Sequence, residues 1–291
     1  MTRTESLCPC CGESTRPWLR ARPGTAGSCY GSRRLLVRNS HGAIAVCRSC
    51  GWGVVSPLPD QTVLNLTYQA SREETYLADA EARKTMFARE LDAVARLLGK
   101  TPSSLLDVGC SYGLLLEEAR ARSIPSVGLE LSDDAVRHCL AAGHAVRQGG
   151  VECLSSGDRF DVAFMWDVLE HVVDPASVIT QVRRHLNPGG ILSLVVPDRG
   201  SLAAKLLGER WWSVCDLHLH YPTAGGMDYL LRRAGFSVVE RTSLPKTAQV
   251  SQFVRWLPGS ALRRALSRVV RHDTLITIDP HDQLLVRARA V

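Results

Sequence analysis

Residues 103 to 197 alternate between short hydrophobic segments and segments with helical spacing, and this alternation limits the fold more than any other feature. The hydrophobic segments read SLLDVG, PSVGLEL, HAVRQG, FDVAFMW and GILSLVVP, with helices expected to end near Ser123, Gly143 and Leu186. Five hydrophobic strands joined by helical crossovers predict an α/β fold whose parallel sheet is covered on both faces. FSVVERTS and QLLVRARA, later in the chain, are also strand-like. Ligands of such sheets bind beyond the carboxyl ends of the strands.

The first of these strands ends in a glycine loop. Asp107 closes the strand, and Gly109 and Gly113 follow before a helix, so the backbone can turn sharply and lie close to a ligand. Glu130, 17 positions after Gly113, ends the next strand, where a carboxylate can accept both hydroxyls of a ribose. The combination predicts a nucleoside-containing cofactor. The alternative is a plain tight turn between strand and helix. The G-x-G-x-x-G spacing of dinucleotide sites is absent.

The D-x-G-x-x-x-G loop, FDVAFMWDVLEHVVDP and LNPGGILSLVVP together resemble the class I S-adenosylmethionine-dependent methyltransferases over residues 103 to about 240. The resemblance implies a Rossmann-like methyltransferase sheet that binds S-adenosyl-L-methionine (SAM), with the loop at residues 150–152 near the adenine. It implies that the loop after the first strand holds the methionine end, that Glu130 holds the ribose, and that Trp166 and Asp167 flank the cofactor beyond the fourth strand. By this resemblance the cofactor-binding residues are Asp107, Gly109, Cys110, Gly113, Glu130, Trp166 and Asp167.

Four cysteines near the N-terminus have the spacing of a metal site. Cys8 and Cys11 form a C-x-x-C pair followed by glycine, and Cys47 and Cys50 repeat the pattern after 35 intervening residues. Two such turns can aim four thiolates at one point, which suits tetrahedral Zn²⁺. RRLLVRNSHGAIAVCRSC reads as two strands around a His-Gly turn, as a zinc ribbon requires. The prediction is therefore a structural zinc ion with Cys10 outside its ligands; a redox dithiol and unliganded thiols are the alternatives.

The chain is expected to divide into three parts. Residues 1–60 are predicted to form the small zinc-ribbon module, residues 61–100 a helical connection or lid, and residues 101–291 the SAM-binding domain. In the connection, apolar residues recur at helical spacing, and Tyr68 and Tyr76 either pack locally or reach into a neighbouring site. The layout resembles bacterial zinc-ribbon methyltransferases that act on nucleotide-linked deoxysugars and other specialised metabolites. Their loop carries Tyr-x-Glu-His, whereas this chain has Cys215 and Leu217 in place of the Tyr and Glu.

Methyl transfer to an alcohol or carbon acid needs a base, and a histidine near the end of the fourth or fifth strand is the natural choice. His171, in LEHVVDP, is one candidate, with packing at a helix start as its alternative. His218 and His220, in DLHLHYPT, are the others; if the segment is extended they share one face, although structural histidines in loops are common. Tyr221 matches a later Tyr of the sugar methyltransferases and completes the set of catalytic candidates.

Composition and charge limit the kinds of partner that we expect for this chain. The chain is 45% hydrophobic and 22% charged, and no apolar run reaches the ~18 residues of a membrane span, so we expect a cytoplasmic protein without membrane contact. Residues 1–50 carry eight arginines against Glu5 and Glu13, which equals the net charge of +6. The basic module allows an RNA methyltransferase as an alternative, although no motif for reading bases is present.

The preferred substrate is a small molecule, with nucleotide- or carrier-linked acceptors included, and nucleic acid is not favoured. O-, N- and C-methylation all stay open. A non-catalytic SAM-binding regulator is the remaining alternative. The segment SALRRALSRVVR is helical in pattern and either contacts an anionic substrate or presents a solvated face. Oligomeric state has no signal in the sequence.

Overall fold

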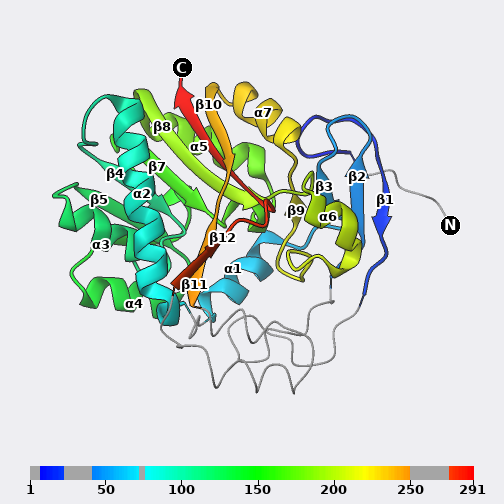
Figure 1. Ribbon diagram of the computed structural model, residues 1–291, viewed down its shortest axis with the longest axis horizontal. Helices are drawn as coiled ribbons and strands as arrows, with labels where there is room; N and C mark the ends of the chain where they lie inside the picture. Colours follow the sequence, from blue (N-terminus) through cyan, green and yellow to red (C-terminus); the bar gives the residue numbers. More distant parts are fainter. Residues whose placement is uncertain (1–6, 23–40, 72–75, 250–274) are drawn as a thin grey trace.

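The computed structural model describes residues 7–22, 41–71, 76–249 and 275–291. A seven-stranded sheet lies at its centre, with the strand order β10-β13-β8-β7-β4-β5-β6 (Figure 1). Its strands are Leu105–Val108 (β4), Ser126–Glu130 (β5), Val146–Gln148 (β6), Phe160–Trp166 (β7), Leu186–Pro197 (β8), Phe236–Ser243 (β10) and Gln283–Ala290 (β13).

The strands β4 to β8 run parallel, and β13 pairs antiparallel with both β8 and β10. This confirms the expected α/β architecture and the two late strands. Strand β4 lies between β5 and β7, so the chain winds in opposite directions from the centre of the sheet. The carboxyl ends of these three strands therefore border a crevice in which a ligand can bind.

Helices cover both faces of the sheet because successive strand residues point to opposite sides. Leu105, Val162 and Ile191 pack with α2 and α3, whereas Leu106, Ala163 and Leu192 pack with α5 and α7. The helices are Gln61–Gln69 (α1), Ala80–Leu98 (α2), Leu114–Ala121 (α3), Asp133–Ala141 (α4), Pro175–His185 (α5), Leu202–Leu207 (α6) and Ala224–Arg233 (α7).

The N-terminal part forms a second, antiparallel sheet with the order β1-β2-β3-β9, at the right of Figure 1. Its strands are Thr15–Leu19 (β1), Ile44–Cys47 (β2), Gly53–Val55 (β3) and His220–Tyr221 (β9). Strand β2 is the second strand of the expected ribbon hairpin; the first, which precedes the His-Gly turn, lies outside the described residues. The fourth strand, β9, comes from a segment far along the chain. The division into modules at residue 60 stays a prediction.

Residues 61–100 contain α1, a 3₁₀ turn at Leu77–Asp79 (η1) and α2. A separate two-stranded sheet pairs Lys246–Gln249 (β11) with Leu275–Ile278 (β12). The basic segment SALRRALSRVVR, at residues 260–271, lies outside the described residues. Within the described part of the chain, no helix has both the length and the apolar composition that crossing a bilayer requires.

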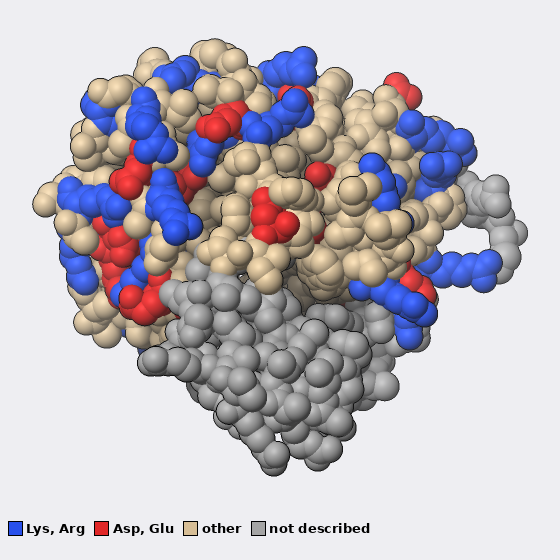
Figure 2. Space-filling view, viewed as in Figure 1, with Lys and Arg blue, Asp and Glu red and all other residues tan. Residues whose placement is uncertain are grey.

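Charged side chains are distributed unevenly over the face drawn in Figure 2. Basic and acidic side chains are interspersed over the helices of the central sheet at the left, whereas basic ones predominate at the right-hand edge (Figure 2). Figure 1 places β1 and β2 at that edge. Arg16, Arg20, Arg22 and Arg48 are the exposed arginines of this N-terminal part among the described residues.

Candidate active site and cysteine cluster

A cavity of about 890 Å³ lies at the carboxyl ends of β4, β5 and β7. The loops after these strands form its floor, and the loop at residues 149–152 lines one side. Tyr68 of α1, Tyr76 directly before η1, and Met86 and Phe87 of α2 line it as well. The connection between the two sheets therefore walls the cavity, and the two tyrosines reach into it.

The glycine loop brings backbone to the cavity floor. Gly109 has φ +74°, and a Cβ there would lie 2.5 Å from Val168 Cγ2, so no larger residue fits without movement. Cys110 lines the cavity, but its thiol packs against β5, because a Cβ on Gly128 would lie 2.6 Å from its sulfur. Gly113 does not line the cavity. It caps α3, where a Cβ would approach Cys139 Sγ at 3.0 Å.

Asp107 and Glu130, the two predicted carboxylates, face this cavity together. Glu130 accepts backbone N–H groups from Ser111 at 2.8 Å, Leu131 at 2.7 Å and Ser132 at 2.8 Å, which fix its orientation. Burial and the Glu130 carboxylate raise the pKa of Asp107 to about 8. A cationic ligand group beside Asp107 would favour its ionised form, so the site suits a ligand with positive charge.

Trp166 and Asp167 line the cavity after β7, as expected from the resemblance. The Trp166 ring lies against Phe87, with 5.0 Å between ring centroids, and its Nε1–H donates to Ser193 Oγ at 3.0 Å. Asp167 Oδ1 accepts from Gln283 Nε2 at 3.1 Å. Both side chains are thus held by the neighbouring strands β8 and β13. Their contacts with a cofactor stay a proposal.

His171 is the one predicted catalytic candidate that lines the cavity in the described structure. It ends the 3₁₀ turn Leu169–His171 (η3), and its Nδ1 lies 2.9 Å from the Leu217 carbonyl oxygen and 2.8 Å from the Tyr68 hydroxyl. If Nδ1–H donates to Leu217, Nε2 is the nitrogen that can take a proton. Burial, with the charge on His218, lowers the pKa of His171 to about 3.

The other three candidates do not line the cavity, which corrects their expected placement. His220 is fully buried, accepts from Trp52 Nε1 at 3.1 Å and has its Nε2 3.4 Å from the Val173 carbonyl oxygen. Tyr221 is fully buried between Trp18 and Trp211. The long-range pairing of β9 with β3 turns both residues into the junction between the sheets.

His218 lies directly behind His171, with 4.8 Å between their ring centroids. Burial lowers the pKa of His218, but the Cys215 thiol and the Glu170 carboxyl outweigh this and raise it to about 9. These two neighbours favour the charged form of His218. It packs beside the candidate base rather than at the cavity wall.

Glu170 was not singled out from the sequence, although it precedes His171 in the same motif. It is fully buried, and neither carboxylate oxygen has a hydrogen-bond partner among the described residues. Its Oε1 lies 4.0 Å from His171 Nε2, and ligand-type atoms of Glu170, His171 and His218 lie within 4.8 Å of one another. Burial raises the pKa of the Glu170 carboxyl to about 8.

Arg83 is a second residue that the sequence did not reveal. It is the one lysine or arginine among the described residues that line the cavity. Its guanidinium lies 4.2 Å from the centroid of the Tyr76 ring, and Tyr76 lies 5.9 Å from the Tyr112 ring of the glycine loop. Among many surface arginines, nothing in the local sequence marks this one; only the packing of α2 onto the loop does.

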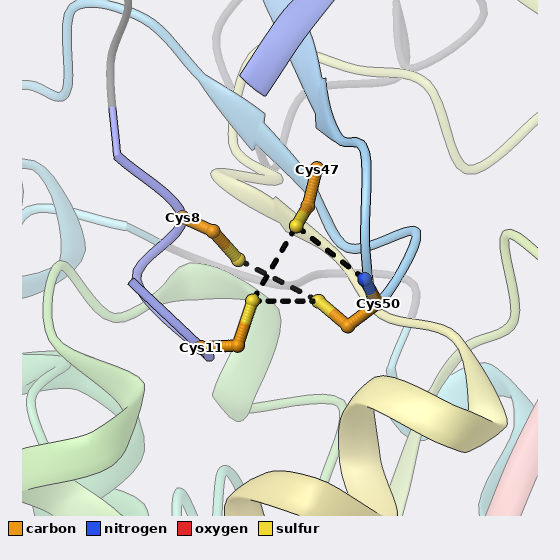
Figure 3. A group of neighbouring side chains, drawn as sticks. All are labelled: Cys8, Cys11, Cys47 and Cys50. Carbon is orange, nitrogen blue, oxygen red and sulfur yellow. Dashed lines mark hydrogen bonds between the residues drawn. The ribbon is translucent and has the colours of Figure 1, made fainter. Parts of the chain in front are cut away.

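The four predicted metal ligands come together in one cluster (Figure 3). Cys8 and Cys50 sulfurs are 3.6 Å apart, those of Cys11 and Cys47 3.4 Å, and those of Cys11 and Cys50 3.6 Å. A tetrahedral zinc site with Zn–S bonds of about 2.3 Å has sulfurs roughly 3.8 Å apart, so the four thiols fit the ion. Cys10 points elsewhere and donates to the Gly226 carbonyl at 3.1 Å. Zinc itself stays a proposal.

Comparison with known proteins agrees with this geometry. A family model described as "Methyltransferase domain" matches residues 80–241, more than half of the chain. The ubiquinone biosynthesis O-methyltransferase of Cereibacter sphaeroides is 30% identical over 175 residues, 54% of this chain and 68% of that protein. That of Methylococcus capsulatus is 32% identical over 158 residues, 52% of this chain and 60% of that protein. The chain thus spans about two thirds of these relatives or less.

A solved structure shares the fold at lower identity. The 1,6-didemethyltoxoflavin-N1-methyltransferase of Burkholderia thailandensis, crystallised with S-adenosylhomocysteine, has a TM-score of 0.52 and 16% identity, covering 85% of this chain and 96% of that one. The matching family model, the strand order and the cavity at the carboxyl ends of β4, β5 and β7 lead to one conclusion. The chain belongs to the methyltransferase-domain family and is a class I SAM-dependent methyltransferase.

Proposed function

We propose that this protein transfers the methyl group of SAM to a hydroxyl oxygen of a small molecule, with His171 taking the hydroxyl proton. The observation that carries the proposal is that His171 lines the same cavity as Asp107 and Glu130. A base and a nucleoside site in one cavity allow acceptor and cofactor to be held side by side. The relatives named above are O-methyltransferases, which supports oxygen as the acceptor atom.

The proposed cofactor contacts divide the cavity into two ends. Glu130 would accept the ribose hydroxyls, and Asp107 would face the ammonium of the methionine moiety. Arg83, beside Tyr76 at the glycine loop, would pair with the carboxylate of that moiety. Trp166 would flank the cofactor from the β7 side. Zn²⁺, bound by the four cysteines, would stabilise the ribbon and take no part in the chemistry, because four thiolates close its coordination sphere.

Replacement of Arg83 by glutamine is expected to weaken S-adenosylhomocysteine binding about tenfold or more, since a charge-assisted hydrogen bond contributes roughly 1.5–3 kcal/mol. Isothermal titration calorimetry measures the change. Lys84→Gln is the matched control: Lys84 is the next residue of α2, pairs with Glu117 at 2.6 Å and does not line the cavity. Equal affinities of the two variants would contradict the role given to Arg83.

The rate of methyl transfer at saturating SAM is expected to rise with pH through about 8. Glu170 is protonated below this value and a carboxylate above it, and the carboxylate stabilises the imidazolium that His171 becomes. The lowered pKa of His171 keeps it neutral throughout, so its own protonation does not cause the rise. In Glu170→Gln the rise through about pH 8 should be absent. A change that remains near pH 9 would come from His218, whose pKa is raised to about 9. A profile unchanged by this substitution would exclude Glu170.

The experiment that tests the proposed function is a screen for S-adenosylhomocysteine formation, with the product identified by mass spectrometry. Small hydroxylated molecules come first because of the O-methyltransferase relatives. Nucleotide-linked sugars and hydroxylated specialised metabolites come second, because of the zinc-ribbon layout. A methylated product whose new methyl group is on nitrogen or carbon would overturn the choice of oxygen but leave SAM dependence intact.

A further inference from the structure

A continuous set of backbone hydrogen bonds connects the N-terminal sheet to His171. Strand β3 pairs with β9, and Val55 N–H donates to the Leu219 carbonyl at 2.8 Å. On the other side of β9 and the residues before it, Leu219 N–H donates to the Glu170 carbonyl at 2.7 Å. His171 Nδ1 lies within hydrogen-bond distance of the Leu217 carbonyl. Residues 217–221 therefore lie between the ribbon and the turn that carries the proposed base.

Side chains reinforce this connection. The Trp52 indole N–H donates to His220 Nδ1 at 3.1 Å, and His220 Nε2 lies 3.4 Å from the Val173 carbonyl oxygen, two residues beyond His171. Trp52 and His220 are both fully buried. Burial makes each contact costly to lose, because a polar atom left without a partner keeps its full desolvation penalty. The two side chains thus span from the ribbon to the residues that follow η3.

The two turns that carry the cysteines also make direct hydrogen bonds to the central part of the structure. Thr223 Oγ1 donates to the Cys50 carbonyl at 2.8 Å, Arg199 donates to the Gly51 carbonyl at 2.8 Å, and the Cys10 thiol donates to the Gly226 carbonyl. The Cys50 and Gly51 carbonyls and the Cys10 thiol lie where they do only while both cysteine turns keep their shape. A zinc ion on the four thiolates would fix that shape.

The cofactor end makes different contacts. Glu130 is held by the backbone of the glycine loop and of residues 131 and 132, and Gly109 and Cys110 donate backbone N–H groups to the Leu129 carbonyl. All of these partners belong to the central sheet and its loops. Loss of the ribbon contacts would therefore act on the base and spare the cofactor site.

We propose that the ribbon is the positioning element for the base: through Trp52, His220 and residues 217–221 it holds the Leu217 carbonyl that orients His171. The inference rests on the proposed role of His171 as the base. The Leu217 carbonyl selects the tautomer in which Nε2 can take the proton, in the way that second partners orient histidines elsewhere. Trp52 and His220 are positioning residues, since neither lines the cavity.

The test uses full-length protein purified with zinc and compared with the Cys8→Ser variant. Zinc content, S-adenosylhomocysteine affinity, kcat and amide hydrogen exchange over residues 215–223 are measured. Loss of zinc is expected to speed exchange at this segment about tenfold or more. It is expected to lower kcat about 10- to 100-fold, with cofactor affinity within about twofold. Cys10→Ser is the matched control, because serine keeps a donor for the Gly226 carbonyl and leaves the four ligands intact.

Trp52→Phe and His220→Gln test the connection with zinc still bound. Each is expected to lower kcat about tenfold while leaving the KM for SAM unchanged. Unchanged exchange over residues 215–223 in Cys8→Ser, or unchanged kcat in Trp52→Phe, would overturn the inference. Loss of cofactor binding together with kcat would also overturn it, because the ribbon would then stabilise the whole fold. Failure of the proposed function is separate: it appears as full activity of a His171 variant in zinc-loaded protein.

Discussion

Replacement of His171 by asparagine is expected to lower kcat about 10²- to 10⁴-fold, the usual contribution of a positioned general base. Asparagine keeps an N–H that can donate to the Leu217 carbonyl but has no nitrogen able to take a proton. The affinity for S-adenosylhomocysteine should change by less than about twofold, because His171 is not one of the proposed cofactor contacts. Steady-state kinetics and calorimetry measure the two quantities.

His185→Asn is the matched control for this variant. His185 ends α5, outside the cavity, and its Nδ1 lies 3.1 Å from the Asp158 carbonyl oxygen. Its substitution should leave kcat unaltered. If His171→Asn keeps wild-type kcat, His171 is not the base.

His218 and His171 have different places relative to the cavity, although both were candidates for the base. Its ring packs on His171 but does not line the cavity. It can therefore act on the reaction only through its neighbour. The sequence could not separate the two, because both histidines lie in loops that follow strands and both suit proton transfer. Their difference comes from which loop reaches the cavity wall, and that depends on packing between segments 46 residues apart.

Local patterns predicted the central sheet and the glycine turn between β4 and α3. Hydrophobic periodicity locates each strand. The glycine at position 109 and the acidic residue that ends β5 can then be recognised from their positions next to those strands. The common face of His218 and His220 was expected only if their segment is extended, and this condition is met in part. Only His220 and Tyr221 form a strand, and its partner is β3 of the N-terminal sheet. Alternation with a period of two residues shows which side chains share a face of a strand. It does not show which distant strand pairs with it, and that pairing decides where the face points.

Helix α2 shows the same limit of periodicity. Its spacing predicts one apolar face, and Phe87, Leu91 and Val94 are indeed buried. Glu90 is buried on α2 as well, with a side chain that is 3% exposed. Its carboxylate is held by Arg287, which arrives from the last strand 197 positions later. A pairing over that separation leaves no local signal in the sequence.

Replacement of Arg287 by methionine is expected to destabilise the fold by about 3–5 kcal/mol, because it leaves the Glu90 charge buried and unpaired. Arg287 Nε donates to Glu90 Oε1 at 2.8 Å, and Arg287 Nη2 donates to Glu90 Oε2 at 2.6 Å. Glu90 Oε1 also accepts from Ser193 Oγ at 2.7 Å, and Ser193 accepts from Trp166. Denaturant unfolding measures the loss. Arg137→Met, which removes a surface pair with Asp134, should cost less than about 1 kcal/mol.

The double variant Glu90→Met with Arg287→Met separates the value of the ion pair from the cost of breaking it. Methionine fills similar volume at both positions without charge, so the double variant should recover most of the lost stability. The hydrogen bond from Trp166 to Ser193 predicts one difference between the double variant and the wild-type protein that remains. Without Glu90, Ser193 Oγ loses the acceptor that orients it toward the indole N–H, so the fluorescence of Trp166 and the affinity for S-adenosylhomocysteine should change even in the stable double variant. Recovery of stability without any change at Trp166 would show that the buried pair stabilises the sheet but does not organise the cofactor site.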